Sequence, residues 1–226
     1  MTRLIILLVV LLEASCVKKT SIEKNTTKKH NRTVIIGSSI SSGVGASSYN
    51  LSWVGLLKDN NLEDTFINVS KPGYATFHFL PTGTLNVPIA PDTTVNISKV
   101  IQLKPDIVII SLTTNDVSYG YAPGTYMTNL KIITDLLDAN SIKYLITSTT
   151  LRSDFTHAQS DSAFTICKLL RANYEFAHYV EIMSTIADTT TFKIDPKYYF
   201  TDLIHPNDLG HSLLYKKIEA KYLEFK

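Results

Sequence analysis

The stretch Thr33-Val34-Ile35-Ile36-Gly37-Ser38-Ser39-Ile40 decides the fold. Its apolar run indicates a buried β-strand that ends at Gly37. Glycine permits a sharp reversal of the backbone, and a Gly-x-Ser turn that closes a strand leaves the serine hydroxyl exposed at the edge of a sheet. We therefore expect a first strand over residues 33–37 and a candidate nucleophile, Ser39, directly after it.

A second informative stretch, Asp202-Leu203-Ile204-His205-Pro206-Asn207, lies near the other end of the chain. An acid three residues before a histidine, on a loop, can turn its carboxylate back onto the imidazole and fix which ring nitrogen stays free to accept a proton. Ser39, His205 and Asp202 together indicate a serine hydrolase site whose parts are far apart in the sequence. Each residue also has a simpler interpretation: a solvated serine-rich turn, a surface histidine, and an aspartate that caps a turn.

Between these two stretches, apolar segments of strand length alternate with longer amphipathic segments. Segments such as residues 107–110 are apolar on both faces, as a parallel sheet covered by helices requires. The pattern predicts an α/β fold, an open sandwich with a five-stranded parallel sheet between helices and with right-handed crossovers. The expected strands are 33–37, 64–69, 106–112, 142–148 and 178–182, and the expected helices are 52–60, 94–103, 126–139, 158–172 and about 207–224.

Sheets of this kind bind their ligands beyond the carboxyl ends of the strands. Ser39 follows the first predicted strand, Gly73 the second and Asn115 the third. Asp202 and His205 lie between the fifth strand and the last helix. All five residues are thus expected at the same edge of the sheet, whereas chance would scatter them over both edges.

With these blocks in order, the chain resembles the SGNH hydrolases, also called the GDSL esterases and lipases, from Val34 to its C-terminus. The resemblance rests on Gly37-Ser38-Ser39-Ile40-Ser41-Ser42-Gly43, Asn68-Val69-Ser70-Lys71-Pro72-Gly73, Thr113-Thr114-Asn115-Asp116 and Asp202-Leu203-Ile204-His205. Two positions depart from the family pattern. Ser38 replaces an aspartate, which spares the nucleophile. Thr113 replaces a glycine, and we expect its side chain to crowd the approach to Asn115.

The resemblance implies a flavodoxin-like three-layer α/β/α fold and ester hydrolysis without a cofactor or a metal. Ser39 would attack the acyl carbonyl, His205 would take and return the proton, and Asp202 would orient and stabilise the imidazolium. The backbone N–H groups of Ser39 and Gly73 and the side-chain amide of Asn115 would form the oxyanion hole.

Aromatic residues gather at the same predicted edge, and such rings can flank a sugar or an acyl chain or simply pack loops onto the core. The irregular stretch 74–92 is expected to border the site. For an exported esterase of this type we expect short acyl groups, such as acetyl, on small molecules or glycans. The rings are Tyr74, Phe77, Phe79, Tyr119, Tyr121, Tyr198, Tyr199 and Phe200.

The N-terminal sequence is typical of an export signal, with Arg3 before an apolar run at residues 4–12. That run is too short for a transmembrane helix, which needs about 20 residues. Small residues before Cys16 resemble a bacterial lipoprotein signal, which would lipidate Cys16 and attach the protein to a membrane in the periplasm or cell envelope. Ordinary secretion is the alternative. We predict a signal peptide over 1–15, a flexible tether over 16–32 and one hydrolase domain over 33–226.

Two other functions are disfavoured. The net charge of +2 gives no basic surface for nucleic acid. Metal-capable side chains do recur every three residues, at Asp202, His205, Asp208 and His211. However, Pro206 and Gly210 interrupt any helix that would place all four on one face, so Asp208 and His211 are better explained as the start of the last helix.

The sequence therefore predicts a serine esterase, and three alternatives keep the same fold. They are an acyl transferase, a lysophospholipase or thioesterase, and a glycan-binding module that has lost catalysis. Retention of every catalytic residue type argues against the binding module. Water and a sugar hydroxyl attack the same acyl-enzyme, so hydrolysis and transfer stay open at this point.

Overall fold

The computed structural model describes residues 30–174, 177–191 and 193–226. The predicted signal peptide, Cys16 and most of the predicted tether lie outside the described residues. Residues 30–32, which the prediction assigns to the tether, belong to the fold. Asn31 is buried and its backbone N–H donates to Asp64 Oδ1 (2.9 Å), and Arg32 begins the first strand. These contacts with distant residues move the start of the folded domain to about residue 30.

Five parallel strands form the central sheet, in the order β2-β1-β3-β4-β5. All five strands expected from the sequence are present, and their ends differ from the prediction by one or two residues. The strands are β1 (Arg32–Gly37), β2 (Thr65–Asn68), β3 (Ile107–Ser111), β4 (Lys143–Thr147) and β5 (Tyr179–Val180).

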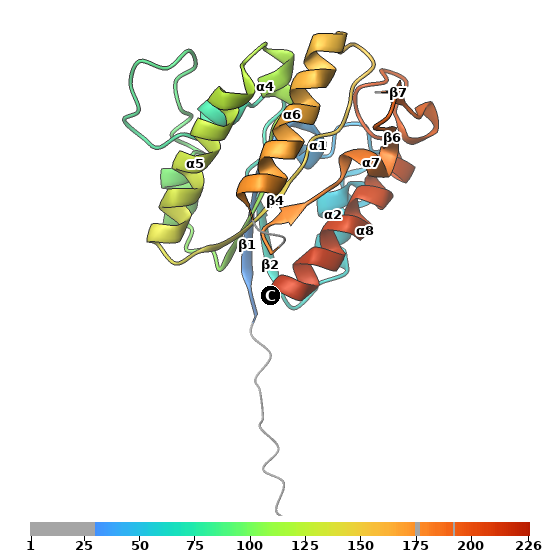
Figure 1. The fold of residues 1–226 in the computed structure, drawn as a ribbon. Helices are drawn as coiled ribbons and strands as arrows, with labels where there is room; N and C mark the ends of the chain where they lie inside the picture. Colours follow the sequence, from blue (N-terminus) through green and yellow to red (C-terminus); the bar gives the residue numbers. More distant parts are fainter. Residues whose placement is uncertain (1–29, 175–176, 192) are drawn as a thin grey trace, which may run out of the picture.

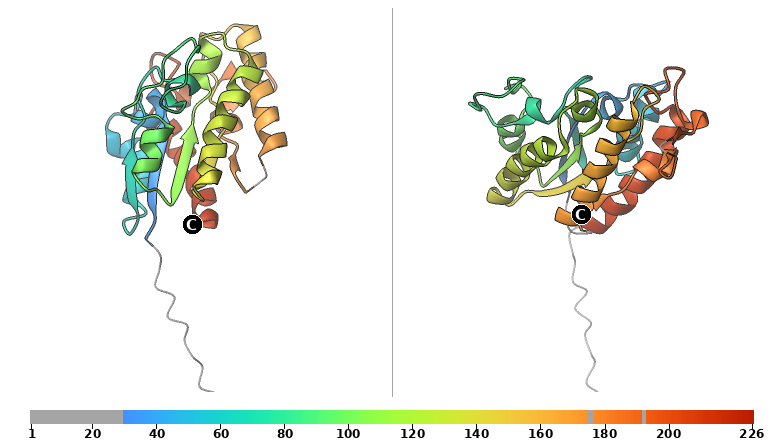
Figure 2. Two further views of the ribbon diagram at one scale, coloured as in Figure 1. Left: turned by 90° about the vertical axis from the view of Figure 1, so that its left-hand side faces the viewer. Right: turned by 45° about the horizontal axis from the view of Figure 1, so that its top comes forward.

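Helices cover both faces of this sheet (Figures 1 and 2). One face packs against α2 (Trp53–Asp59) and α8 (Asp208–Phe225). The other packs against α3 (Ile97–Gln102), α5 (Pro123–Ala139) and α6 (His157–Asn173). The predicted three-layer α/β/α sandwich with a parallel sheet is therefore confirmed.

The strands are apolar along their whole length because both of their faces are buried. Successive side chains of a strand point to opposite faces. In β1, Val34 and Ile36 lie in the core shared with α5 and α6, whereas Ile35 lies in the core shared with α2 and α8. All three are fully buried. The same alternation along β3 explains the continuous apolar run at residues 107–110.

Several short elements were not predicted from the sequence. Each has five residues or fewer, which is too short to show a hydrophobic period. Two of them, α1 and α4, begin at the carboxyl ends of β1 and β3, where ligands bind in this class of fold. The short elements are α1 (Ser39–Ser42), η1 (Tyr49–Leu51), η2 (Thr76–Phe79), α4 (Thr114–Ser118), α7 (Met183–Ile186), β6 (Ala187–Asp188), β7 (Lys193–Ile194) and η3 (Pro196–Tyr198).

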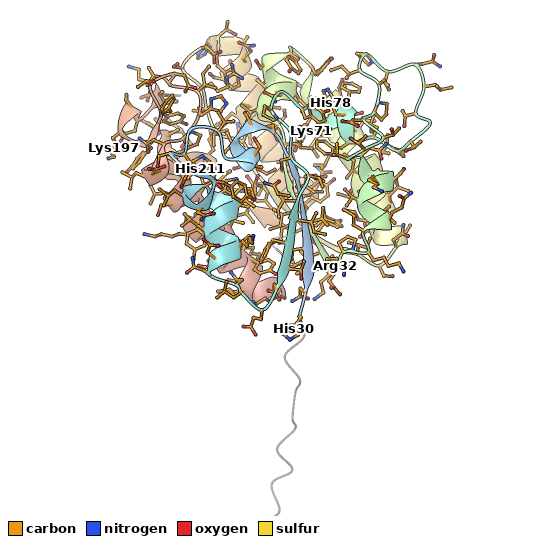
Figure 3. The ribbon with its side chains drawn as sticks, turned by 180° about the vertical axis from the view of Figure 1, so that it is seen from behind. His30, Arg32, Lys71, His78, Lys197 and His211 are labelled. Carbon is orange, nitrogen blue, oxygen red and sulfur yellow. The ribbon has the colours of Figure 1, made fainter. Side chains whose placement is uncertain are left out.

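The two edges of the sheet face opposite ends of the molecule. Figure 3 shows His30 and Arg32 at one end, where the chain enters the domain, and Lys71 and His78 near the other. The predicted border stretch 74–92 divides in two: its first part forms η2 at the carboxyl edge, and the following loop extends away from the sandwich (Figure 1, upper left). Among the described residues, no helix has the length and apolar character to span a membrane.

Candidate active site

Gly37, the last residue of β1, lies between the segments that carry Gly73 and Asn115 and pairs with both. Its carbonyl accepts the backbone N–H of Lys71 (3.2 Å), and Gly37 pairs with Ser111 at the end of β3. Ser39, Gly73 and Asn115 follow these three positions closely in sequence and so reach the same edge. A Cβ at residue 37 would collide with Ser41 and lie 2.9 Å from Ser111 O, so steric fit is the main reason for glycine here.

The fold brings Ser39, His205 and Asp202 together. His205 Nε2 lies 2.9 Å from Ser39 Oγ, and His205 Nδ1 lies 2.7 Å from Asp202 Oδ2. An ionised carboxylate only accepts hydrogen bonds, so Nδ1 carries the ring proton and Nε2 accepts the serine hydroxyl. This is the arrangement in which a histidine activates a serine as a nucleophile.

A tight loop between Tyr199 and Pro206 presents the acid and the histidine. These two residues form a β-bridge that closes the loop. Within it, Leu203 adopts a left-handed conformation with φ of 55°. The turn lets Asp202 Oδ1 accept the backbone N–H groups of Ile204 (2.8 Å) and His205 (3.0 Å). The carboxylate thus turns back onto the imidazole that follows it, as the three-residue spacing suggests.

The charge of Asp202 is stabilised within this loop. Partial burial opposes its ionisation, but hydrogen bonds from the His205 ring and from the backbone of His205 and Ile204 outweigh that effect. The pKa of Asp202 is therefore held below its ordinary value. Asp202 is ionised at neutral pH, as an anion that stabilises a neighbouring imidazolium must be.

Asp208 and His211 hold the segment that follows α1. The carboxylate of Asp208 accepts the backbone N–H and the hydroxyl of Ser47, each at 2.7 Å. His211 is fully buried, accepts the Trp53 N–H at Nδ1 (3.3 Å) and donates from Nε2 to Val44 O (3.1 Å). Burial lowers the pKa of His211 to about 4, so the ring is neutral, as one accepting and one donating nitrogen require.

The three-residue repeat near the C-terminus thus divides into two pairs with different contacts. His205 contacts Ser39 and Asp202 contacts His205, whereas Asp208 and His211 lie in the first turn of α8 and support the loop that follows Ser39 and α1. In the part of the chain that the structure describes, no three His, Cys, Asp or Glu side chains converge on a common point as metal ligands would.

Gly73 adopts a backbone conformation that favours glycine, with φ of 80°. A Cβ at this position would meet only the hydroxyl of Tyr119 at 3.5 Å, an ordinary contact distance, so the conformation and not the available space accounts for the glycine. Tyr119 donates its hydroxyl hydrogen to Gly73 O (2.7 Å). The peptide that follows Gly73 is therefore held in place.

Asn115 lies in the first turn of α4 and is largely buried. Its Nδ2 donates to Tyr74 O (3.0 Å), which fixes the plane of the amide and distinguishes its nitrogen from its oxygen. A side-chain amide has two N–H donors. One is engaged by Tyr74, and the second makes no further hydrogen bond within the described residues, so it is available to a ligand.

Thr113 does not crowd Asn115, and the prediction on this point is wrong. Only 1% of Thr113 is exposed, so its side chain is buried and adds almost nothing to the surface around Asn115. Thr113 has φ of 115° and ψ of −52°, a region that a β-branched residue rarely adopts. The departure from the family's glycine therefore affects backbone strain at the start of α4 and not access to the site.

The eight rings of the predicted aromatic edge differ in exposure, and Tyr74, Tyr121 and Tyr198 are partly buried. Tyr119 and Phe200 are each 49% exposed. Tyr119 contacts Gly73, and the backbone N–H of Phe200 donates to His205 O (2.8 Å). One exposed aromatic residue therefore lies beside the oxyanion candidate Gly73 and the other beside His205. In contrast, Phe77, Phe79 and Tyr199 are buried and serve packing.

A parallel α/β sandwich with a hydrogen-bonded serine, histidine and aspartate at its carboxyl edge is characteristic of hydrolases with a serine nucleophile. The model of the GDSL-like lipase/acylhydrolase family matches residues 35–213. The chain belongs to this family, and it is accordingly a hydrolase of ester bonds.

Solved structures share this fold. A Bacteroides fragilis NCTC 9343 protein assigned as an acylhydrolase is 21% identical, with 87% of this chain and 88% of that chain covered and a TM-score of 0.65. The psychrotrophic esterase EstA from Pseudoalteromonas sp., in a structure inhibited by monoethylphosphonate, is 18% identical, with coverages of 86% and 98% and a TM-score of 0.64. A search of curated proteins gave no significant match.

A two-domain esterase active on acetylated mannans, co-crystallised with mannopentaose, is a third neighbour. It is 18% identical, with 87% of this chain and 50% of that chain covered and a TM-score of 0.61. At such low identity these neighbours establish the common fold.

Sequence reasoning missed the support that α4 gives to the oxyanion candidates. Asp116 directly follows Asn115, and its buried carboxylate accepts hydrogen bonds from Thr76. Tyr119, one turn later, holds Gly73. The only sequence signal was the position of these residues inside and just after a family block, since α4 is too short to give a helical pattern.

Proposed function

We propose that this protein is a serine esterase that hydrolyses acyl esters through an acyl-enzyme on Ser39. The observation that carries the proposal is the continuous hydrogen-bonded chain from Ser39 Oγ to His205 Nε2 (2.9 Å) and from His205 Nδ1 to Asp202 Oδ2 (2.7 Å). These distances are those of a proton-transfer path from a hydroxyl to a general base.

The reaction proceeds in two halves. Ser39 Oγ attacks the acyl carbon while His205 takes the hydroxyl proton, and the same proton then passes to the oxygen of the departing alcohol. Water attacks the resulting ester of Ser39, again with His205 as the base, and the acid is released as the serine recovers its proton. In each half the carbonyl oxygen becomes negative and accepts hydrogen bonds from Ser39 N–H, Gly73 N–H and the Asn115 amide.

Short acyl groups on carbohydrate are the substrate class that we propose. The exposed rings of Tyr119 and Phe200 offer apolar faces of the kind that stack on sugars. The structural neighbour that acts on acetylated mannans supports the same substrate class. Initial rates with acetyl, butyryl and palmitoyl aryl esters, and with an acetylated oligosaccharide, test the proposal. Preference for palmitoyl would overturn it, and product analysis with an acceptor sugar separates hydrolysis from acyl transfer.

We also propose that the mature protein is a cell-envelope lipoprotein anchored through Cys16. The sequence before Cys16 supports the anchor, and the position of His30 supports its orientation, because the chain enters the domain at the end opposite the site (Figure 3). An anchored domain would then present its catalytic edge away from its own membrane. Metabolic labelling with a palmitate analogue tests the anchor, and equal labelling of the wild type and Cys16→Ala would contradict it.

The nucleophile is tested most directly with a fluorophosphonate probe. The wild-type protein should become labelled, and Ser39→Ala should not. Ser42→Ala is a matched control, because Ser42 lies in the same turn of α1 but donates its hydroxyl to Ser39 O (2.8 Å). Equal labelling of the wild type and Ser39→Ala would eliminate Ser39 as the nucleophile.

A further inference from the structure

Side chains of helix α4 and of the residue after it contact three residues of the segment that carries Gly73. Tyr119 Oη donates to Gly73 O (2.7 Å) and Asn115 Nδ2 donates to Tyr74 O (3.0 Å). Asp116 accepts the Thr76 N–H (3.1 Å) and the Thr76 hydroxyl. Three polar side chains within or directly after one short helix thus hold three residues of the neighbouring loop.

We propose that these contacts form a bracket that sets the oxyanion donors relative to Ser39, with Asp116 and Tyr119 as its positioning residues. The bracket comprises Asn115 and Asp116 of α4, Tyr119 directly after α4, and the three residues that they hold, Gly73, Tyr74 and Thr76. The inference rests on the proposed function, because it concerns the Gly73 N–H and the Asn115 amide as oxyanion donors. Neither Asp116 nor Tyr119 is assigned contact with the reacting atoms.

Asp116 is the buried end of the bracket. It is fully buried, and both of its oxygens are engaged by Thr76. Asn129 of α5 in turn donates to the Thr76 hydroxyl (2.9 Å), which connects the bracket to a long helix of the sandwich. Among the described residues, Asp116 accepts hydrogen bonds from Thr76 and from its own backbone but from no cation, and burial outweighs them and raises its pKa to about 6. A buried carboxylate without a cationic partner costs stability, and its hydrogen bonds hold the donor groups in place.

Tyr119 holds the other end of the bracket, at Gly73. Left-handed glycine can reorient at little steric cost, so the direction of the Gly73 N–H depends on what holds the adjacent peptides. Tyr119 holds the carbonyl of Gly73, and Asn115 holds the carbonyl of the next residue. Together they restrict rotation of this turn, and oxyanion stabilisation requires donors that are already in place before the charge develops.

The experiment compares Asp116→Asn and Tyr119→Phe with the wild type on an aryl acetate, in the full-length protein. We expect kcat to fall about 10-fold in each variant with KM changed less than about 2-fold, because the donors matter in the transition state and misplacement of a catalytic group by about 1 Å already costs up to 100-fold. Tyr119→Phe removes one hydroxyl from a half-exposed ring, so it keeps the test valid if Asp116→Asn does not fold.

Asp64→Asn is the matched control at the opposite edge of the sheet. Asp64 is also buried and also accepts one backbone N–H, from Asn31 (2.9 Å), and one hydroxyl, from Tyr222 (2.8 Å), but it accepts the Lys226 ammonium (3.0 Å) as well. It lies at the amino edge of the sheet and so has no contact with the site. Asp64→Asn should lower the thermal midpoint and leave kcat unchanged.

A double-mutant cycle distinguishes positioning from general damage. In an Asn115→Ala background, Asp116→Asn should lower kcat much less than it does in the wild type, because one of the donors it positions is already gone. Full additivity, or unchanged kcat in both single variants, would overturn the bracket. Ester hydrolysis that is equal in the wild type and Ser39→Ala would instead overturn the proposed function, so the two failures are distinguishable.

Discussion

Each edge of the sheet carries a buried aspartate, and the pKa values of these two aspartates shift in opposite directions. At the amino edge, Asp64 accepts hydrogen bonds from Asn31, Tyr222 and Lys226, which outweigh the effect of its burial and lower its pKa. At the carboxyl edge, burial dominates and raises the pKa of Asp116 to about 6. One edge neutralises its buried charge with a cation and the other does not. Asp116 therefore costs stability beside the candidate site, whereas the hydrogen bonds and the ion pair of Asp64 contribute to stability at the amino edge.

Backbone conformation shows the same difference. At the amino edge, Lys104 and Ser141 have φ of 51° and 56°, the usual left-handed residues just after a helix. At the carboxyl edge, Thr113 has φ of 115°, outside that common region, and Leu203 is left-handed within the loop that presents His205. Of these residues only Thr113 lies outside the common left-handed region, so backbone strain occurs two residues before the oxyanion candidate Asn115.

The largest expected effect is that of Asp202→Asn. An amide at this position cannot hold the ring proton of His205 on Nδ1, so we expect kcat to fall about 10⁴-fold with little change in stability. Steady-state kinetics and thermal unfolding measure the two effects. A loss of less than about 10-fold would show that Asp202 merely caps its turn and does not stabilise the imidazolium.

Asn115→Ala should have the next largest effect. Loss of one oxyanion donor lowers kcat by about 10²- to 10³-fold while substrate binding changes little. Asn140→Ala is the control, since the Asn140 amide also donates to a backbone carbonyl, Leu136 O (2.8 Å), but at the C-terminal end of α5. Equal kcat values for the two variants would contradict the oxyanion assignment.

The buried His211, which supports the loop that follows Ser39 and α1, should make stability depend on pH. The pKa of His211 is about 4 in the fold, below its ordinary value of 6.5, so between these values the unfolded chain binds a proton that the folded chain does not. Its contribution is therefore present above about pH 6.5 and is lost as the pH falls toward 4, by about 3 kcal/mol.

Denaturant unfolding of the wild type and His211→Gln measures this contribution. The difference in unfolding free energy between the two proteins should shrink by about 3 kcal/mol from pH 7 to pH 4. A difference that does not vary with pH would show that the neutral ring of His211 is not what holds Val44 and Trp53.

The smallest expected effect is a gain in stability from Thr113→Gly. Glycine removes the strain of φ at 115°, so the unfolding free energy should rise by about 1 kcal/mol with activity retained. Ser141→Gly, at the amino edge, should gain less, because its conformation is already a common one. If Ser141→Gly gained more than Thr113→Gly, strain would not be concentrated at the carboxyl edge.

Most of the fold could be predicted because its signals are local. The apolar runs of β1 and β3 mark strands buried on both faces, and the longer amphipathic segments mark α5, α6 and α8. The short helices α1 and α4 could not be predicted, since five residues or fewer carry no periodicity. The start of the domain was placed too late because Asn31 and Arg32 are held by Asp64 and Asp106, which lie far along the chain.

By itself, the sequence determined the order of strands and helices along the chain, because hydrophobic period and turn chemistry depend on neighbouring residues alone. That order also determined the edge of the sheet at which Ser39, Gly73, Asn115 and His205 lie. Only the tertiary structure decided the contact between Ser39 and His205, which are 166 residues apart, and the direction of the Thr113 side chain. It also decided the ionisation of Asp116 and His211. Contact, orientation and burial arise from packing between distant segments, and no local pattern encodes them.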